Sequence, residues 1–174
     1  DLAPQNCLFW VCMVSTTVNF SAIYPGTIIS EINGTSITTV ISSTAAPFVG
    51  SLSVTAGRIY SSNKPVHFGD QGNNNYTIAP MSYRGNILGF YSNRYHPATL
   101  RIYCLEDNTD IEVFAYSITG TNSILVDSSS NLSQGTVESY SISSTYDDVW
   151  IWVKSNNKIL GTGKGNPGDK FILP

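Results

Sequence analysis

Apolar and polar residues alternate along this chain, and turn-forming residues interrupt the alternation at intervals of roughly 8–12 positions. Leu100, Ile102 and Cys104 fall on one face of an extended segment, and Ile111, Val113 and Ala115 do the same in the next. No window has a convincing helical period. The pattern predicts an all-β fold of short antiparallel strands, as in a sandwich or barrel, with helix limited to single turns.

The source of the polarity limits the possible partners. Only 12% of the residues are charged and the net charge is −3, whereas Ser, Thr and Asn make up 54 of the 174 residues. So weak a field does not attract nucleic acid or an anionic membrane surface. The apolar run from Cys7 to Val14 is far shorter than the roughly 20 residues that span a bilayer. We therefore expect no nucleic-acid partner and no membrane insertion, and we interpret the run as a buried strand.

The three cysteines, Cys7, Cys12 and Cys104, are too few for a disulfide framework and lack zinc-site spacing. At most one bridge could form. We expect buried, reduced thiols that pack as small apolar side chains, and we expect no cofactor.

Two hairpins are predicted. Residues 26–32 and 36–41 flank Asn33-Gly34, a dipeptide suited to a tight turn. Residues 100–104 and 111–115 flank the acidic turn Glu106 to Asp110.

The two halves of the chain resemble each other. Asn63-Lys64-Pro65-Val66 precedes a Gly/Asn-rich loop and Pro80, and Asn157-Lys158-Ile159-Leu160 precedes a similar loop and Pro174 at the same spacing. Upstream, Pro25-Gly26-Thr27 matches Pro97-Ala98-Thr99. Such a repeat predicts two tandem β-sandwich-like modules that run in the same order. We expect an N-terminal apolar strand or extension at 1–17, a first module at 18–85 and a second at 86–174, able to pack as one body.

These motifs resemble a known family. Glu106-Asp107-Asn108-Thr109, Ser62-Asn63-Lys64-Pro65-Val66 and Ile78-Ala79-Pro80 are similar to turn and strand signatures of the repeated β-sandwich module in the N-terminal region of the IgG-Fc-binding protein. Similar modules occur in bacterial surface proteins and in structural proteins of marine tailed phages, especially cyanophages. The resemblance covers about 18–174 and implies a fold more than a function. Ile159 stands where the pattern has Pro, and Ile32-Asn33-Gly34-Thr35 replaces the full acidic turn.

Catalytic and metal motifs are weak. The glycines of residues 161–168 lack the following helix that a phosphate site needs, so we expect a hairpin loop leading into a strand at 170–173. Glu106, Asp107, Asp110 and Glu112 lack EF-hand spacing, and we expect a solvated turn and no metal site. His67 and His96 are the only histidines and belong to no recognisable catalytic motif. We expect a protein that is not an enzyme and has no catalytic residues.

Aromatic residues are the remaining candidates for binding. Trp150 and Trp152 share one face of a strand whose other face carries Val149, Ile151 and Val153. A central strand would bury both indoles, and this is the reading that we favour from the sequence. If both indoles are exposed instead, they form a stacking platform for sugar rings. Tyr91, Tyr95 and Tyr103 are a weaker group, suited to an interface.

Together these features predict a non-catalytic structural or attachment protein. The resemblance implies a tailed-phage virion component in the tail, neck, fibre or capsid decoration, located on a virion or outside cells. Its expected partners are copies of itself, other virion or surface proteins and a host-surface glycan. The alternative is a secreted carbohydrate-binding or adhesion module.

Overall fold

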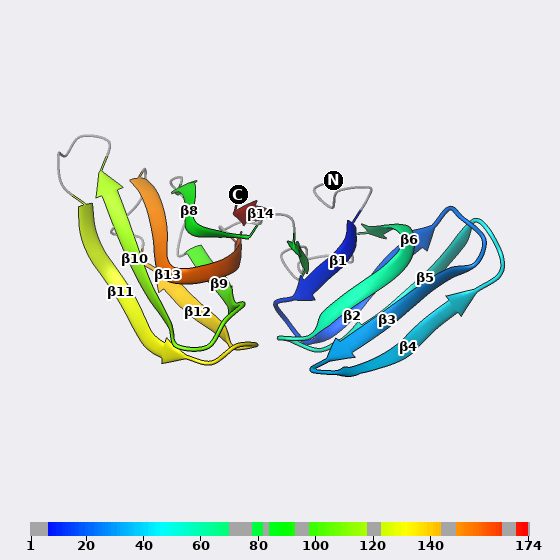
Figure 1. Ribbon diagram of the computed structural model, residues 1–174. Helices are drawn as coiled ribbons and strands as arrows, with labels where there is room; N and C mark the ends of the chain where they lie inside the picture. The colour runs from blue at the N-terminus through cyan, green and yellow to red at the C-terminus, as the bar shows by residue number, and fades with distance from the viewer. Residues whose placement is uncertain are drawn as a thin grey trace. The chain divides into compact units, whose positions relative to one another are not determined.

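The computed structural model describes residues 7–69, 78–81, 84–92, 98–117, 123–143, 149–164 and 170–173. These residues form two compact units, Asp1–Ser82 and Tyr83–Pro174, each built around its own antiparallel sheet (Figure 1). No α-helix occurs in the described ranges. The predicted all-β class with two tandem modules is confirmed.

The described residues of each unit form seven strands. Those of the first unit are β1 (Cys7–Cys12), β2 (Thr16–Ala22), β3 (Thr27–Asn33), β4 (Ser36–Ser43), β5 (Phe48–Val54), β6 (Ile59–Gly69) and β7 (Ile78–Pro80). Those of the second are β8 (Gly85–Ser92), β9 (Ala98–Cys104), β10 (Thr109–Ser117), β11 (Ser123–Leu132), β12 (Val137–Ile142), β13 (Val149–Lys164) and β14 (Lys170–Leu173).

Six strands of each unit are connected and paired in the same way. The first half of β6 lies between β1 and β3, and its second half pairs with β2. Likewise, the first half of β13 lies between β8 and β10, and its second half pairs with β9. In the first unit β4 pairs with β3 and β5 pairs with β2. In the second unit β11 pairs with β10 and β12 pairs with β9 in the same way. The seventh strand differs, because β7 pairs with β1 whereas β14 pairs with β13.

The repeat is real, but its register differs from the sequence prediction by one position. Val66 pairs with Ala22, and Ile159 pairs with Cys104 at the corresponding place, so Asn63 corresponds to Asn156 and not to Asn157. Ile159 and Leu160 are both apolar and fully buried, so either of them could match Val66. Asn156 and Asn157 stand side by side, so either of them could match Asn63, and the sequence comparison chose the wrong pair.

The second predicted hairpin is wrong. Residues 100–104 belong to β9, which pairs with β12 and β13, and residues 111–115 belong to β10, which pairs with β11 and β13. The acidic turn therefore carries the chain from one pair of strands to another, as the turn between β2 and β3 does in the first unit. Alternation assigns faces but not strand partners, and this is why the error arose.

Other local predictions are confirmed in part. The β3–β4 hairpin forms, but its two turn residues are Gly34 (φ 60°) and Thr35, because Asn33 still belongs to β3 and pairs with Ser36. The strand at 170–173 forms and pairs back onto β13, but residues 161–164, which were expected in the loop, belong to β13 and supply this pairing; residues 165–169 lie outside the described residues. The N-terminal apolar run forms β1, in which Trp10, Val11 and Cys12 are fully buried, so the segment 1–17 contributes a strand to the first sheet.

The turns before β3 and β10 have one construction. Gly26 (φ 68°) and Asn108 (φ 54°) occupy the left-handed position, for which glycine and asparagine are best suited. The next residue is a buried threonine whose hydroxyl donates to the carbonyl three residues back: Thr27 to Tyr24 and Thr109 to Glu106, each at 2.7 Å.

An asparagine at the middle of each long strand holds this turn. Asn63 donates to the Gly26 carbonyl (3.0 Å) and accepts from the Ile28 N–H (2.8 Å). Asn156 bonds Asn108 and Asp110 in the same way, at 3.0 and 2.8 Å. The backbone pairing of β3 with β6 ends at Ile29, and that of β10 with β13 ends at Ile111. The side-chain amides of Asn63 and Asn156 continue the hydrogen bonding beyond these residues. We name this arrangement the asparagine bridge.

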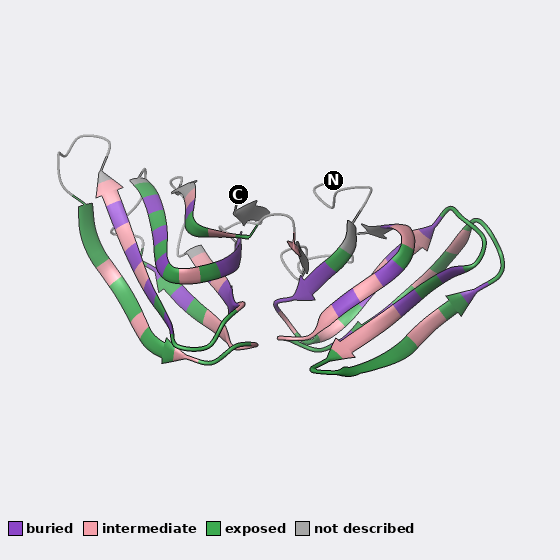
Figure 2. Cartoon of the chain, viewed as in Figure 1, coloured by how far each residue is buried: buried purple, intermediate pink, exposed green. Residues whose placement is uncertain are grey.

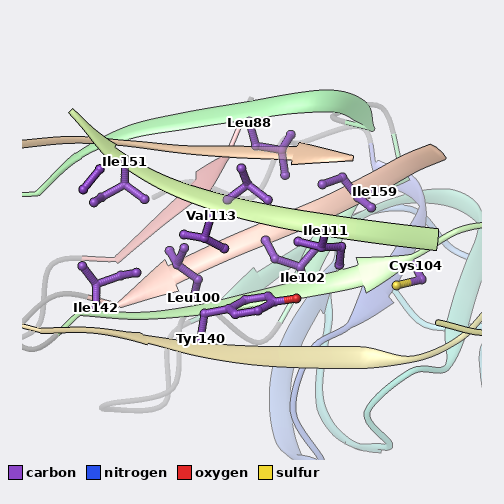
Figure 3. Packing of buried hydrophobic residues seen from close by; sticks show 12 residues of the cluster. Leu88, Leu100, Ile102, Cys104, Ile111, Val113, Tyr140, Ile142, Ile151 and Ile159 are labelled. Atoms are coloured by element: carbon purple, nitrogen blue, oxygen red, sulfur yellow. The ribbon is translucent and has the colours of Figure 1, made fainter. Parts of the chain in front are cut away.

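Separate cores lie beneath the two sheets. The first contains Trp10, Phe20, Ile29 and Tyr60, with the rings of Trp10 and Tyr60 stacked at 6.1 Å. The second is mainly aliphatic and gathers side chains from β8, β9, β10, β12 and β13 (Figure 3). Burial of each such aliphatic side chain stabilises its unit by about 1.5–3 kcal/mol.

Replacing either bridging asparagine tests this interpretation of the fold. Asn63→Ala and Asn156→Ala each remove two hydrogen bonds and leave turn groups without a partner, so we expect a loss of about 1–2 kcal/mol in the free energy of unfolding. Urea unfolding followed by hydrogen exchange should place the loss in the first unit for Asn63 and in the second for Asn156.

The matched control is Asn19→Ala, which removes a single contact of 3.3 Å with the Ser51 hydroxyl. If the bridge variants lose no more stability than this control, the bridge does not stabilise the fold.

Candidate functional site

The outer side of β13 presents two tryptophans to solvent. Trp150 is 45% exposed and Trp152 43% exposed, whereas Ile151 and Val153, which alternate with them, are fully buried. Figure 2 shows this alternation as bands along β13. The indole rings are stacked, with centroids 6.4 Å apart and planes inclined by 29°. Burial of both faces, which the sequence favoured, is therefore wrong: β13 is central to the sheet, but only one of its faces meets the core.

Register brings further apolar side chains beside the tryptophans. Trp152 is opposite Phe114 of β10, which in turn is opposite Leu125 of β11, and Trp150 is opposite Tyr116. Paired residues point to the same side of a sheet, so the five residues form one surface. Phe114 and Tyr116 are half-buried, and Leu125 is 51% exposed. We call Trp150, Trp152, Phe114, Tyr116 and Leu125 the aromatic face.

A glycine on the neighbouring strand fixes how Trp152 lies. Gly89 of β8 pairs with Trp152, and a Cβ added to Gly89 would lie only 3.3 Å from the indole Cε3. The ring therefore lies over the backbone of β8, where a side chain would otherwise stand. Two ring carbons, Cε3 and Cζ3, lie 3.3 and 3.4 Å from that Cβ position, so any side chain at position 89 would crowd the indole.

The charge next to the aromatic face is balanced. Glu112 and Lys154 are the next cross-strand pair along β10 and β13, and their charged groups are 3.8 Å apart. An exposed pair of this kind adds little stability. Among the described residues, this pair places one charge of each sign beside the face, which suits an uncharged ligand.

The tyrosine group predicted from the sequence does not come together as a described surface. Tyr103 is 3% exposed and belongs to the interior, so its assignment to a surface is wrong. Tyr91 is opposite Trp150 in the backbone register, but its side chain lies outside the described residues, as does Tyr95.

The histidines can be placed only in part. The backbone of His67, in β6, pairs with that of Ser21 in β2. The side chain of His67 and the whole of His96 lie outside the described residues. The prediction that the chain is not an enzyme stays a prediction.

The acidic turn has structural tasks. Asp107 accepts the Gln134 N–H and Asp110 accepts the Asn131 N–H, at 2.8 and 2.9 Å. These bonds tie the turn before β10 to the end of β11. Among the described residues, no group of three or more His, Cys, Asp or Glu side chains could hold a metal ion.

A buried polar network in the first unit was not foreseen. The Tyr60 hydroxyl donates to Glu31 (2.7 Å) and accepts from the Thr55 N–H (3.2 Å), and Arg58 lies 3.8 Å from the same carboxylate. Burial and the bond to Glu31 raise the pKa of Tyr60. The network satisfies a buried hydroxyl beside Trp10 and therefore supports the core rather than a reaction.

The described cysteines are inert. Cys12 and Cys104 are free and buried, as predicted, and the side chain of Cys7 lies outside the described residues. Burial raises the pKa of Cys104 to about 11, and burial together with the charge of Glu31 raises the pKa of Cys12. Thiols held in the neutral form are poor nucleophiles and poor metal ligands.

Comparison with known proteins adds no relative to this chain. No family model matches it, and neither does any curated protein or solved structure. The resemblance to the IgG-Fc-binding repeat and to phage structural proteins stays a prediction. Within the described residues, we find no helix with the length and apolarity needed to cross a membrane.

The aromatic face could have been found from the sequence in part. Phe114 and Tyr116 alternate with the apolar residues of β10, which places them on the side away from the core. Their position beside the tryptophans depends on the register of β10 with β13, and no local signal gives that register.

The position of Trp152 over Gly89 can be tested spectroscopically. A branched side chain in Gly89→Val should displace the ring and weaken the exciton coupling between the stacked indoles in the circular dichroism spectrum. Gly85→Ala on the same strand is the matched control, because its nearest non-adjacent atom would be 3.4 Å away, an ordinary contact. Unchanged coupling in Gly89→Val would show that the glycine does not set the ring.

Stability should fall in alkaline solution. Burial raises the pKa of Tyr140 to about 12 and that of Cys104 to about 11, so the native state keeps these groups neutral while the unfolded chain begins to ionise. Their contribution to stability is complete below the unfolded pKa of each group and is lost as the pH rises through the native values. The urea midpoint should decline above about pH 9, and less steeply in Cys104→Ala. An equally steep decline in that variant would contradict the assignment to Cys104.

Proposed function

We propose that this chain is a non-catalytic structural and attachment protein whose second unit binds surface carbohydrate through the aromatic face. The observation that carries the proposal is the pair of stacked, exposed indoles on a β-sheet. Monomeric proteins seldom expose contiguous apolar surface without an interaction purpose, and aromatic residues are typical binding anchors.

The ligand class follows from the chemistry of the face. An indole offers a flat apolar surface that matches the C–H side of a sugar ring, and the Ser-rich strand β11 at the edge of the face offers uncharged groups that can bond sugar hydroxyls. The balanced Glu112–Lys154 pair gives no preference for a strongly anionic or cationic ligand. A neutral glycan therefore fits better than a polyanion.

The setting that we propose is the exterior of a tailed-phage particle, where such a protein joins other virion proteins and contacts the host surface. The support is the similarity of the turn and strand motifs to phage structural proteins and the low charge of the whole chain. A surface with few charges desolvates at low cost when subunits pack together. A secreted carbohydrate-binding module is the second candidate, and the aromatic face favours it equally.

A glycan array tests the binding. Wild-type protein should give saturable binding to at least one neutral glycan, and Trp150→Ala and Trp152→Ala should weaken it about tenfold or more, since loss of an aromatic anchor typically costs roughly 2 kcal/mol.

Ile37→Ala and Val49→Ala are the matched controls, because both residues are exposed apolar side chains of the first unit. If these controls lose as much binding as the tryptophan variants, or if no glycan binds, the aromatic face is not a carbohydrate site.

Particle composition separates the two settings. Antibodies raised against the purified chain should label the intact phage particles whose genome encodes this chain. Unlabelled particles, with the protein free in the medium and still binding glycan, would contradict the virion setting and support the secreted module.

A further inference from the structure

The two units share a topology but treat their sheet edges differently. The described outer strands of the first unit are β4, β5 and β7, and none of them contains Asp, Glu, Lys or Arg. In the second unit, β11 and β12, which correspond to β4 and β5, each carry an acidic residue, Asp127 and Glu138, whereas the outer strand β8 is uncharged but contains two glycines, Gly85 and Gly89. Proteins commonly use charges, bulges and shielding side chains to keep an open edge from pairing with another chain.

The edge of β11 has several such protections. Its pairing with β10 is interrupted by two register shifts. The Asp127 carboxylate accepts the N–H of Ser128 at 2.8 Å, and the Asp110 carboxylate accepts the N–H of Asn131 at 2.9 Å. Two backbone donors of this strand are therefore already occupied by side chains.

The equivalent strand of the first unit, β4, has few of these protections against edge pairing. It pairs with β3 over its whole length with one register shift, and no described strand pairs with its other side. Residues 37–41 are all β-branched, which favours the extended conformation, and the strand contains neither Gly nor Pro. Ile37 is 70% exposed. The strand thus offers a neutral row of backbone donors and acceptors with an apolar side chain beside it.

We propose that β4 pairs with β4 of a second copy of this chain, antiparallel about a two-fold axis, to join the two sheets. Two identical strands in this arrangement supply matching donors and acceptors, and the absence of charge in β4 means that no like charges meet. The contact is isologous, so it closes at a dimer. β5 is the poorer partner, because Gly50 interrupts it and weakens extended pairing.

This inference rests on the proposed assembly of the protein with itself and names the surface that does it. The first unit then serves assembly and the second serves binding. The division accounts for the uncharged, β-branched edge strand β4 in one unit and the exposed aromatic face in the other.

Sedimentation over a range of protein concentrations tests the pairing. Wild-type chain should form a dimer, and Ile37→Lys should be monomeric over the same range, because it brings two like charges close to the joined edge. Hydrogen exchange should show protection of the amides of residues 36–43 in the wild-type dimer that the variant lacks.

Two matched variants control for a general effect of added charge. Ile124→Lys places lysine on the corresponding strand β11, and Val49→Lys places it on β5; both replace exposed apolar residues. Both should remain dimeric. A monomeric wild-type chain, an Ile37→Lys variant that still dimerises, or a control that dissociates as Ile37→Lys does would overturn the proposal.

Glycan binding by the Ile37→Lys monomer separates failure of the β4 pairing from failure of the proposed carbohydrate binding. Binding per chain should match that of wild type, since the aromatic face lies in the other unit. A wild-type chain that is monomeric but still binds glycan would overturn only the pairing of β4.

Discussion

The fold of each unit depends on a long strand that belongs to two parts of one sheet, and on the asparagine that makes the change of partner possible. Where β6 leaves β3 for β2, and where β13 leaves β10 for β9, backbone pairing stops. Asn63 and Asn156 supply the missing donor and acceptor from a side chain. A left-handed residue and a buried threonine complete the turn that each amide meets. Curling the sheet in this way buries one of its faces and leaves the other to solvent.

On this common frame the units have diverged in their surfaces. The first has aromatic side chains in its core, where Trp10 stacks on Tyr60, and its outer strands β4 and β5 carry no charge. The second has a mainly aliphatic core, and its largest side chains, Trp150 and Trp152, lie outside. Because the core of each unit is complete by itself, the outer faces are free to serve assembly in one and recognition in the other.

The sequence predicted what is local and failed at what is not. Alternation identified the β class and the buried face of Ile111 and Val113, and the turn signal near Gly34 identified the hairpin of β3 and β4, although the turn begins one residue later than predicted. It did not show that β9 and β10 pair with other strands, because turn residues look alike whether a turn joins neighbours or crosses to another pair. The repeat was placed one position out, because Ile159 and Leu160 are both buried and two asparagines stand together. The tryptophans were expected inside, since a central strand of a two-layered sheet is often covered on both faces; here only one face meets a core.

Solute quenching of tryptophan fluorescence tests most directly whether the outer face of β13 is an open binding surface. In a Trp10→Phe chain the remaining emission comes from Trp150 and Trp152, because the chain has three tryptophans. We predict that a neutral quencher reaches both indoles in the free protein, and that a bound saccharide protects them. Indoles that are already shielded in the free chain, or equally quenched when a saccharide is bound, would contradict the account.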